Sequence, residues 1–167
     1  MEVHSQIQLQ KPFDAVVSER RTYPITEDEP EEKHTYLSYN KVVGTVLDRE
    51  LYQAFSILDY VLVSAPGAPV RQALIDAGIG EDVYGSFEDG MLQPMFSIVA
   101  KNADESDQTR FVQIIEETLQ KLVKEGLNQD SLLAGINSAE FRFREADYGQ
   151  FPKGLLYGLQ CMDCLLY

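Results

Sequence analysis

Histidine spacing is the first test for metal chemistry in this sequence. The chain has 167 residues and only two histidines, His4 and His34, which lie far apart. Zinc peptidases of the HExxH and HxxEH types hold the metal with two imidazoles one helical turn apart and use a glutamate to activate water. Neither spacing occurs here. We therefore expect no metal ligands in this chain, and we expect His34 to be a partly exposed side chain of a strand.

The two cysteines form the second candidate, because Cys161 and Cys164 have C-x-x-C spacing. A redox pair of this type sits at a helix amino terminus, where the local field lowers the pKa of a thiol. Here the pair lies deep in an apolar helical stretch, so we expect two buried structural thiols, with a thiol redox module as an alternative. Two cysteines are also too few for a disulfide-dependent secreted scaffold, which favours a cytoplasmic location.

Other catalytic patterns are missing from the sequence. No G-x-S-x-G stretch could place a nucleophilic serine on a sharp turn. Gly78-Ile79-Gly80 begins like a dinucleotide-binding loop, but it lacks the third glycine and follows a helical segment. Carboxylates are so abundant that no single pair is informative. We therefore expect no catalytic residues in the isolated chain.

Composition and charge exclude two classes of partner. Apolar residues make up 44% of the chain and charged residues 25%, which is typical of a globular domain. The 27 acidic and 14 basic residues give a formal net charge of -13. Nucleic-acid phosphates and anionic lipids both require a basic surface, and no stretch approaches the ~18 apolar residues of a spanning helix. We expect no nucleic-acid partner and no membrane association.

The first part of the chain contains apolar and polar residues in alternation. This pattern predicts strands over 3–9, 15–23 and 33–43. Residues 27–32 place five carboxylates around a proline, a density that predicts an exposed loop. The loop and the two strands that flank it predict a hairpin.

The rest of the chain reads mainly as helices. Asp48 can cap a helix that carries apolar residues on most sides, and Gly78 can end a short helix over 70–77. A strand is predicted over 93–101. Further helices are predicted to begin near Asp104 and to end at Gly126, to begin at Asn128 or Asp130, and to begin after Pro152. These elements predict an α+β domain with an antiparallel sheet packed against several helices. The last helix reaches Tyr167 without a cap, so we expect the chain to be part of a longer polypeptide.

Several stretches in this order resemble the pitrilysin/insulinase family of zinc metallopeptidases. The resemblance covers residues 33–167 and points to the presequence-protease-like oligopeptidases. It rests on SAPGAPVRQALIDAGIG (64–80), MFSIVAK (95–101), KEG (124–126), NSAEFRFRE (137–145) and FPKGL (151–155).

This resemblance implies an insulinase/mitochondrial-processing-peptidase-like metallohydrolase fold. Residues 33–167 are then the second, non-catalytic domain, truncated at its carboxyl end, and residues 1–32 are the linker and first strand that lead in from a preceding domain. Family members resemble a clamshell of homologous domains, in which an HxxEH motif of the first domain holds zinc. The resemblance therefore implies zinc in the catalytic domain of a parent enzyme, no cofactor in this chain, and two partners: other domains of the same polypeptide and peptide substrates.

The resemblance also implies a binding site. Domains of this type complete the wall of a peptide chamber, and one strand binds the amino-terminal part of a substrate by β-augmentation. The equivalent residues here are Val83, Tyr84, Gly85 and Ser86, with Ser86 in place of a second glycine. An exposed strand edge offers unpaired backbone groups, and glycine allows another backbone to approach closely. The alternative is that Gly80, Gly85 and Gly90 only shape turns and a bulge.

One further function remains open from sequence alone. A free-standing structural or interaction protein could keep this fold without catalysis, as a subunit of a processing-peptidase complex does. The two functions differ in what the parent reading frame encodes upstream of Met1.

Overall fold

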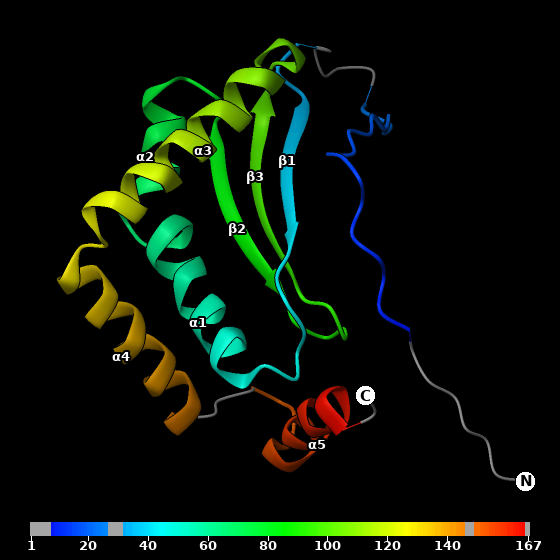
Figure 1. The fold of residues 1–167 in the computed structure, drawn as a ribbon, viewed down its shortest axis with the longest axis vertical. Coiled ribbons are helices and arrows are strands. Elements are labelled where there is room, and N and C mark those ends of the chain that lie inside the picture. The colour runs from blue at the N-terminus through cyan, green and yellow to red at the C-terminus, as the bar shows by residue number, and fades with distance from the viewer. Residues whose placement is uncertain (1–7, 27–31, 146–148, 166–167) are drawn as a thin grey trace, which may run out of the picture.

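An antiparallel sheet forms the centre of the molecule. The structure is a computed structural model, and it describes residues 8–26, 32–145 and 149–165. Its strands are β1 (Thr35–Val42), β2 (Asp82–Glu88) and β3 (Met95–Ala103), in the spatial order β1-β3-β2. Both pairings are antiparallel, and helices cover one face of the sheet (Figure 1). The predicted α+β fold is confirmed, and β1 and β2 are the two edge strands.

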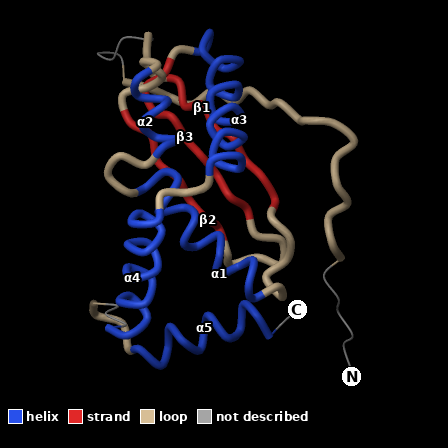
Figure 2. Tube along the Cα trace, turned by 60° about the vertical axis from the view of Figure 1, so that its left-hand side comes forward, coloured by secondary structure: helices blue, strands red, loops and turns tan. Residues whose placement is uncertain are grey.

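The helices form two groups around this sheet. The helices α1, α2 and α3 lie against the sheet, α4 packs outside α1, and α5 lies at the end of the molecule away from α2 and α3 (Figure 2). A π-helical turn (Tyr60–Ser64) continues α1, and a 3-10 turn (Glu105–Asp107) precedes α3. The helix bounds are α1 (Arg49–Asp59), α2 (Pro69–Asp76), α3 (Gln108–Glu125), α4 (Gln129–Glu145) and α5 (Lys153–Leu165).

The predicted helix caps are present. The carboxylate of Asp48 accepts the N–H of Leu51 at 3.0 Å, and Asn128 Oδ1 accepts the N–H of Ser131 at 2.9 Å. Each cap satisfies one of the backbone donors that the first turn leaves without an intrahelical partner. Gly78 follows α2 with φ +72°, a conformation that costs glycine little. The two side-chain caps thus mark where α1 and α4 begin, and Gly78 marks where the chain leaves α2.

The hydrophobic core lies between the sheet and the helices. Alternate residues of each strand face the helices because successive side chains of a strand point to opposite faces. The core includes Leu37, Val63, Leu74, Val83, Phe96, Ile98, Ala100, Phe111 and Ile115. The apolar residues on most sides of the helix that begins after Asp48 indicated burial on most sides, but α1 contains no fully buried residue. Only the π-helical turn that continues it buries residues fully (Val61, Leu62 and Val63).

The strand predicted over 15–23 is wrong. Residues 8–26 form no strand or helix, and the side chain of Val16 is 95% exposed. Side chains rather than a backbone ladder hold this segment. The amide of Gln93 bonds both main-chain groups of Gln10, accepting at 2.7 Å and donating at 3.2 Å. An alternating sequence forms a strand only where a neighbour pairs with it, so the predicted hairpin does not form. Residues 1–7 and 27–31 lie outside the described residues.

Candidate functional site

The candidate residues Val83, Tyr84, Gly85 and Ser86 lie together on the edge strand β2. The side chain of Val83 is 1% exposed, whereas that of Tyr84 is 41% exposed. Val83 and Gly85 face the helices, while Tyr84 and Ser86 face the opposite side of the sheet, as strand alternation requires. Among the described residues no strand pairs with the outer side of β2. The structure thus places all four residues on one strand, as the resemblance implied.

Hydrogen bonds around Asp82 show which backbone groups of β2 point outward. The N–H of Val83 donates to Asp82 Oδ1 at 2.9 Å, and the same oxygen accepts Nη2 of Arg71 from α2 at 3.0 Å. A carboxylate held by a helix beside the sheet lies at the free edge, so the N–H of Val83 points away from β3. Backbone groups alternate between the two sides of a strand. The main-chain groups of Gly85 therefore point to the same free edge.

No side chain fits at position 85, because other atoms already fill the space that a Cβ would occupy. A Cβ at this position would overlap Oδ1 of Asp59 and lie 3.1 Å from Cβ of Val63. Gly85 pairs with Ile98 in an unbroken register along β2, so it forms no bulge. The turn-and-bulge interpretation is thus wrong for Gly85. It is right for Gly80, which has φ +71° and lies two residues before the start of β2.

Asp59 is the group that fills this space. Its Oδ2 accepts the hydroxyl of Ser64 at 3.0 Å, whereas its Oδ1 is buried and receives no hydrogen bond from any described residue. Burial raises the pKa of the Asp59 carboxyl above its ordinary value, and the Ser64 hydrogen bond and the positive charge of Arg142 offset part of that rise. A buried acceptor without a partner destabilises a fold, and π-helical turns often occur at functional sites. Asp59 therefore differs from an ordinary surface carboxylate in its raised pKa and in its buried oxygen that accepts no hydrogen bond from a described residue.

The described residues contain no metal centre, because no three histidine, cysteine, aspartate or glutamate side chains among them converge. His34 is partly exposed, as predicted, but it lies just before β1 rather than in the strand, and His4 lies outside the described residues. The prediction of two buried thiols is wrong for Cys161, which is exposed and free. The reason is the position of α5, in which none of the described side chains is fully buried. The side chain of Cys164 is outside the described set.

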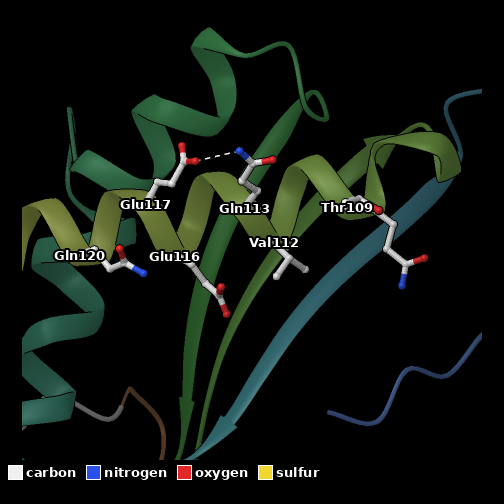
Figure 3. A pocket seen from close by; sticks show the side chains of 7 residues that line it. Thr109, Val112, Gln113, Glu116, Glu117 and Gln120 are labelled. Atoms are coloured by element: carbon white, nitrogen blue, oxygen red, sulfur yellow. Dashed lines mark hydrogen bonds between the residues drawn. The ribbon is translucent and has the colours of Figure 1, made fainter. Parts of the chain in front are cut away.

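A shallow concavity lies on α3, and it carries no catalytic arrangement (Figure 3). Its side chains all come from one helix, and Gln113 donates to Glu117 at 2.8 Å across it. The lining consists of Gln108, Thr109, Val112, Gln113, Glu116, Glu117 and Gln120. This set has no nucleophile paired with a base. Within the described ranges, no helix combines the length and apolarity needed to cross a membrane.

Comparison with known proteins identifies the family. The family model described as "Peptidase M16 inactive domain" matches residues 3–138. This chain belongs to the M16 peptidase inactive-domain family. The family match confirms the resemblance to zinc metallopeptidases and agrees with the expectation that the isolated chain is not catalytic.

Relatives of this M16 inactive domain are much longer proteins. Protein HypA of Clostridium perfringens is 40% identical over 166 residues, which are 99% of this chain and 17% of that protein. Presequence protease 1 of Arabidopsis thaliana, named as chloroplastic/mitochondrial, is 33% identical over 165 residues, 98% of this chain and 15% of that protein. The chain thus spans about a sixth of the length of these curated relatives, 17% and 15%.

Solved structures agree on the fold. The M16 inactive domain from Pseudomonas fluorescens matches with a TM-score of 0.52 and 16% identity, over 77% of this chain and 30% of that one. A Bordetella pertussis protein described as a zinc protease matches with a TM-score of 0.58 and 14% identity, over 69% of this chain and 63% of that one. These M16 structures confirm the α+β architecture.

Asp59 and Arg142 are the residues of this M16 inactive domain that sequence reasoning missed. Asp59 is the only acidic residue in the apolar run 54–63, and that isolation was the available signal. Its role depends on contact with Gly85, which lies on an element distant in sequence. Periodicity within one segment does not predict such a contact.

Proposed function

We propose that this M16 inactive domain binds extended peptides along the outer edge of β2, as a non-catalytic part of a zinc-dependent oligopeptidase. One observation carries the proposal: β2 is an edge strand whose outer side has no paired strand among the described residues. Added strands bind through the main chain, and pockets for alternate side chains give specificity.

The other edge of the sheet is a weaker candidate. Residues 8–26 run on the β1 side of the molecule (Figure 1). Tyr23 contacts Tyr36 of β1 edge-to-face, with ring centroids 5.6 Å apart, and its hydroxyl donates to the carbonyl of His34. A peptide approaching β1 meets this segment. At the outer edge of β2 the Asp82 carboxylate occupies the N–H of Val83, whereas Gly85 adds no side chain there.

Backbone pairing at β2 predicts modest affinity. Each new backbone hydrogen bond contributes about 0.5–1.5 kcal/mol, and the peptide loses conformational freedom when it is ordered. Tyr84 and Ser86 lie on the sheet face away from the helices, where they can contact alternate side chains of the added strand. Main-chain pairing without deep side-chain pockets favours binding of many peptide sequences.

The rest of the proposal concerns the parent protein. We propose that this domain forms part of a peptide chamber, with other domains of the same polypeptide as partners and zinc bound by another of those domains. The length of the relatives and the word "protease" in one of their names support this. An HxxEH motif encoded upstream of Met1 in the same reading frame is expected. A stop codon directly after Tyr167 without such a motif would favour a free-standing interaction protein. The cytoplasmic location stays a prediction.

Hydrogen–deuterium exchange of the whole chain tests peptide binding at β2. With an extended peptide in excess, we expect slower exchange of the amides that face the free edge of β2, including that of Gly85. Amides of β1 serve as the internal control and should exchange unchanged. Protection confined to β1, or no protection in either strand, would refute the proposed site.

A further inference from the structure

The contact between Gly85 and Asp59 brings a carboxylate to the proposed peptide-binding edge. Gly85 lies between Val83 and Phe87 on the helix-facing side of β2, and Asp59 fills the gap that its missing side chain leaves. Oδ2 of Asp59 is bonded to Ser64, whereas no described residue donates to Oδ1. Asp59 as a whole is only partly buried. Asp59 therefore lies beside an edge strand with one carboxylate oxygen, Oδ1, that accepts no hydrogen bond from a described residue.

Pairing geometry shows which part of a bound peptide meets Asp59. Neighbouring strands lie about 4.7–4.9 Å apart, and directly opposite residues project side chains to the same face. A peptide residue opposite Gly85 therefore projects its side chain toward the helix layer, beside the carboxylate. Gly85 places no side chain between the two. The flanking residues Val83 and Phe87 are apolar, so they offer no competing charge.

We propose that Asp59 is a specificity-determining residue that selects a cationic side chain, lysine or arginine, at the peptide position paired with Gly85. This inference rests on the proposed function of β2. A lysine or arginine can keep its apolar stem against the partly exposed Phe87 while its charged end reaches the carboxylate. A charge-assisted hydrogen bond at a partly buried site is stronger than one between neutral groups.

Arg142 of α4 is the competing cation. Its positive charge acts on Asp59 and offsets part of the rise in the pKa of that carboxyl. It is an exposed side chain, so its hold on the carboxylate is weak. A peptide cation at the edge therefore shares the carboxylate with Arg142 or displaces it. Removing Arg142 should strengthen the selection for a cationic peptide side chain.

The test compares two peptides that differ at one position, where one has lysine and the other has norleucine, which is neutral and similar in shape. Moving this position along the peptide in a series of pairs finds the residue that lies opposite Gly85. Affinities for the whole chain are measured at pH 8 and low salt. We expect about a tenfold preference for lysine at one position, the size of a charge-assisted hydrogen bond. Asp59→Asn should abolish this preference, so that the lysine and norleucine peptides bind the variant with equal affinity. Arg142→Gln should increase it.

The outcomes separate this inference from the proposed function. If both peptides bind equally at every position, or if Asp59→Asn keeps the lysine preference, the role of Asp59 is refuted while peptide binding at β2 stands. If neither peptide binds, both proposals fail. If the Asp59→Asn variant does not fold, measurements on the wild-type chain still test the role of Asp59. Its lysine preference must fall as salt is raised and as the pH is lowered until Asp59 is protonated, and a preference independent of both refutes the inference.

Discussion

Replacing Gly85 with alanine tests whether the Asp59 carboxylate occupies the space beside the edge strand. The new methyl group would overlap Oδ1 of Asp59 and lie 3.1 Å from Cβ of Val63, which belongs to a fully buried side chain. Val63 has little freedom to move because it is part of the core. Asp59 must therefore turn away from β2, or the strand must shift outward.

The expected cost follows from two opposing effects. Overfilling a packed site destabilises a protein by about 1–3 kcal/mol. Replacing a glycine inside a strand by alanine restores about 0.5–1 kcal/mol, because the unfolded chain loses freedom. The net loss in the free energy of unfolding is about 1–2 kcal/mol. With a urea m-value of about 2 kcal/mol/M, the midpoint falls by about 0.5–1 M.

Urea unfolding of the chain, followed by circular dichroism, measures this loss. Gly90→Ala is the matched control, since Gly90 is exposed and a Cβ there meets nothing within 4 Å. In an Asp59→Ala background, Gly85→Ala should cost less, with a coupling energy of about 1 kcal/mol. If Gly85→Ala destabilises no more than Gly90→Ala, the packing of Asp59 against Gly85 is refuted.

Three further predictions follow from single residues. Burial raises the pKa of Asp59 in the folded state, so the folded state binds the proton of Asp59 more tightly than the unfolded state does. The stability that this group contributes is therefore lost as the pH rises from the ordinary aspartate range through the raised pKa. Asp59→Asn should therefore raise the melting temperature at pH 7 and make less difference at lower pH; an equal effect at every pH contradicts this. Asp48→Ala should lower the free energy of unfolding by about 1 kcal/mol through loss of the α1 cap, and denaturant unfolding with no change would count against the cap. Cys161 should react with a thiol reagent in the folded chain at nearly the rate seen in urea, since it is exposed; slow labelling would contradict its placement on α5.

The sequence predicted most elements that pack against the core. Alternation in 33–43 indicated β1, which buries one face, and the apolar run in 93–101 indicated β3, the central strand. Asp48 indicated the start of α1, and Asn128 or Asp130 indicated that of α4, where Asn128 proves to be the cap. Such signals are local, so one sequence is enough to detect them.

The errors arose where structure depends on distant partners. Residues 15–23 alternate as a strand does, but no neighbouring strand pairs with them, and Val16 is left exposed. The apolar residues of α5 suggested a buried helix, although Cys161 is exposed. The candidate site shows the same limit: the family resemblance indicated Val83–Ser86, whereas Asp59 became visible only when folding placed it against Gly85.

Backbone N-methylation of a bound peptide tests peptide pairing with β2 most directly. Each methyl group removes one N–H donor and adds bulk on one side of the peptide strand. Because N–H groups alternate between the two sides of a strand, methylation should abolish binding at every second position and have little effect at the positions between them. Affinity that is insensitive to methylation, or that falls equally at successive positions, would contradict binding by strand addition to β2.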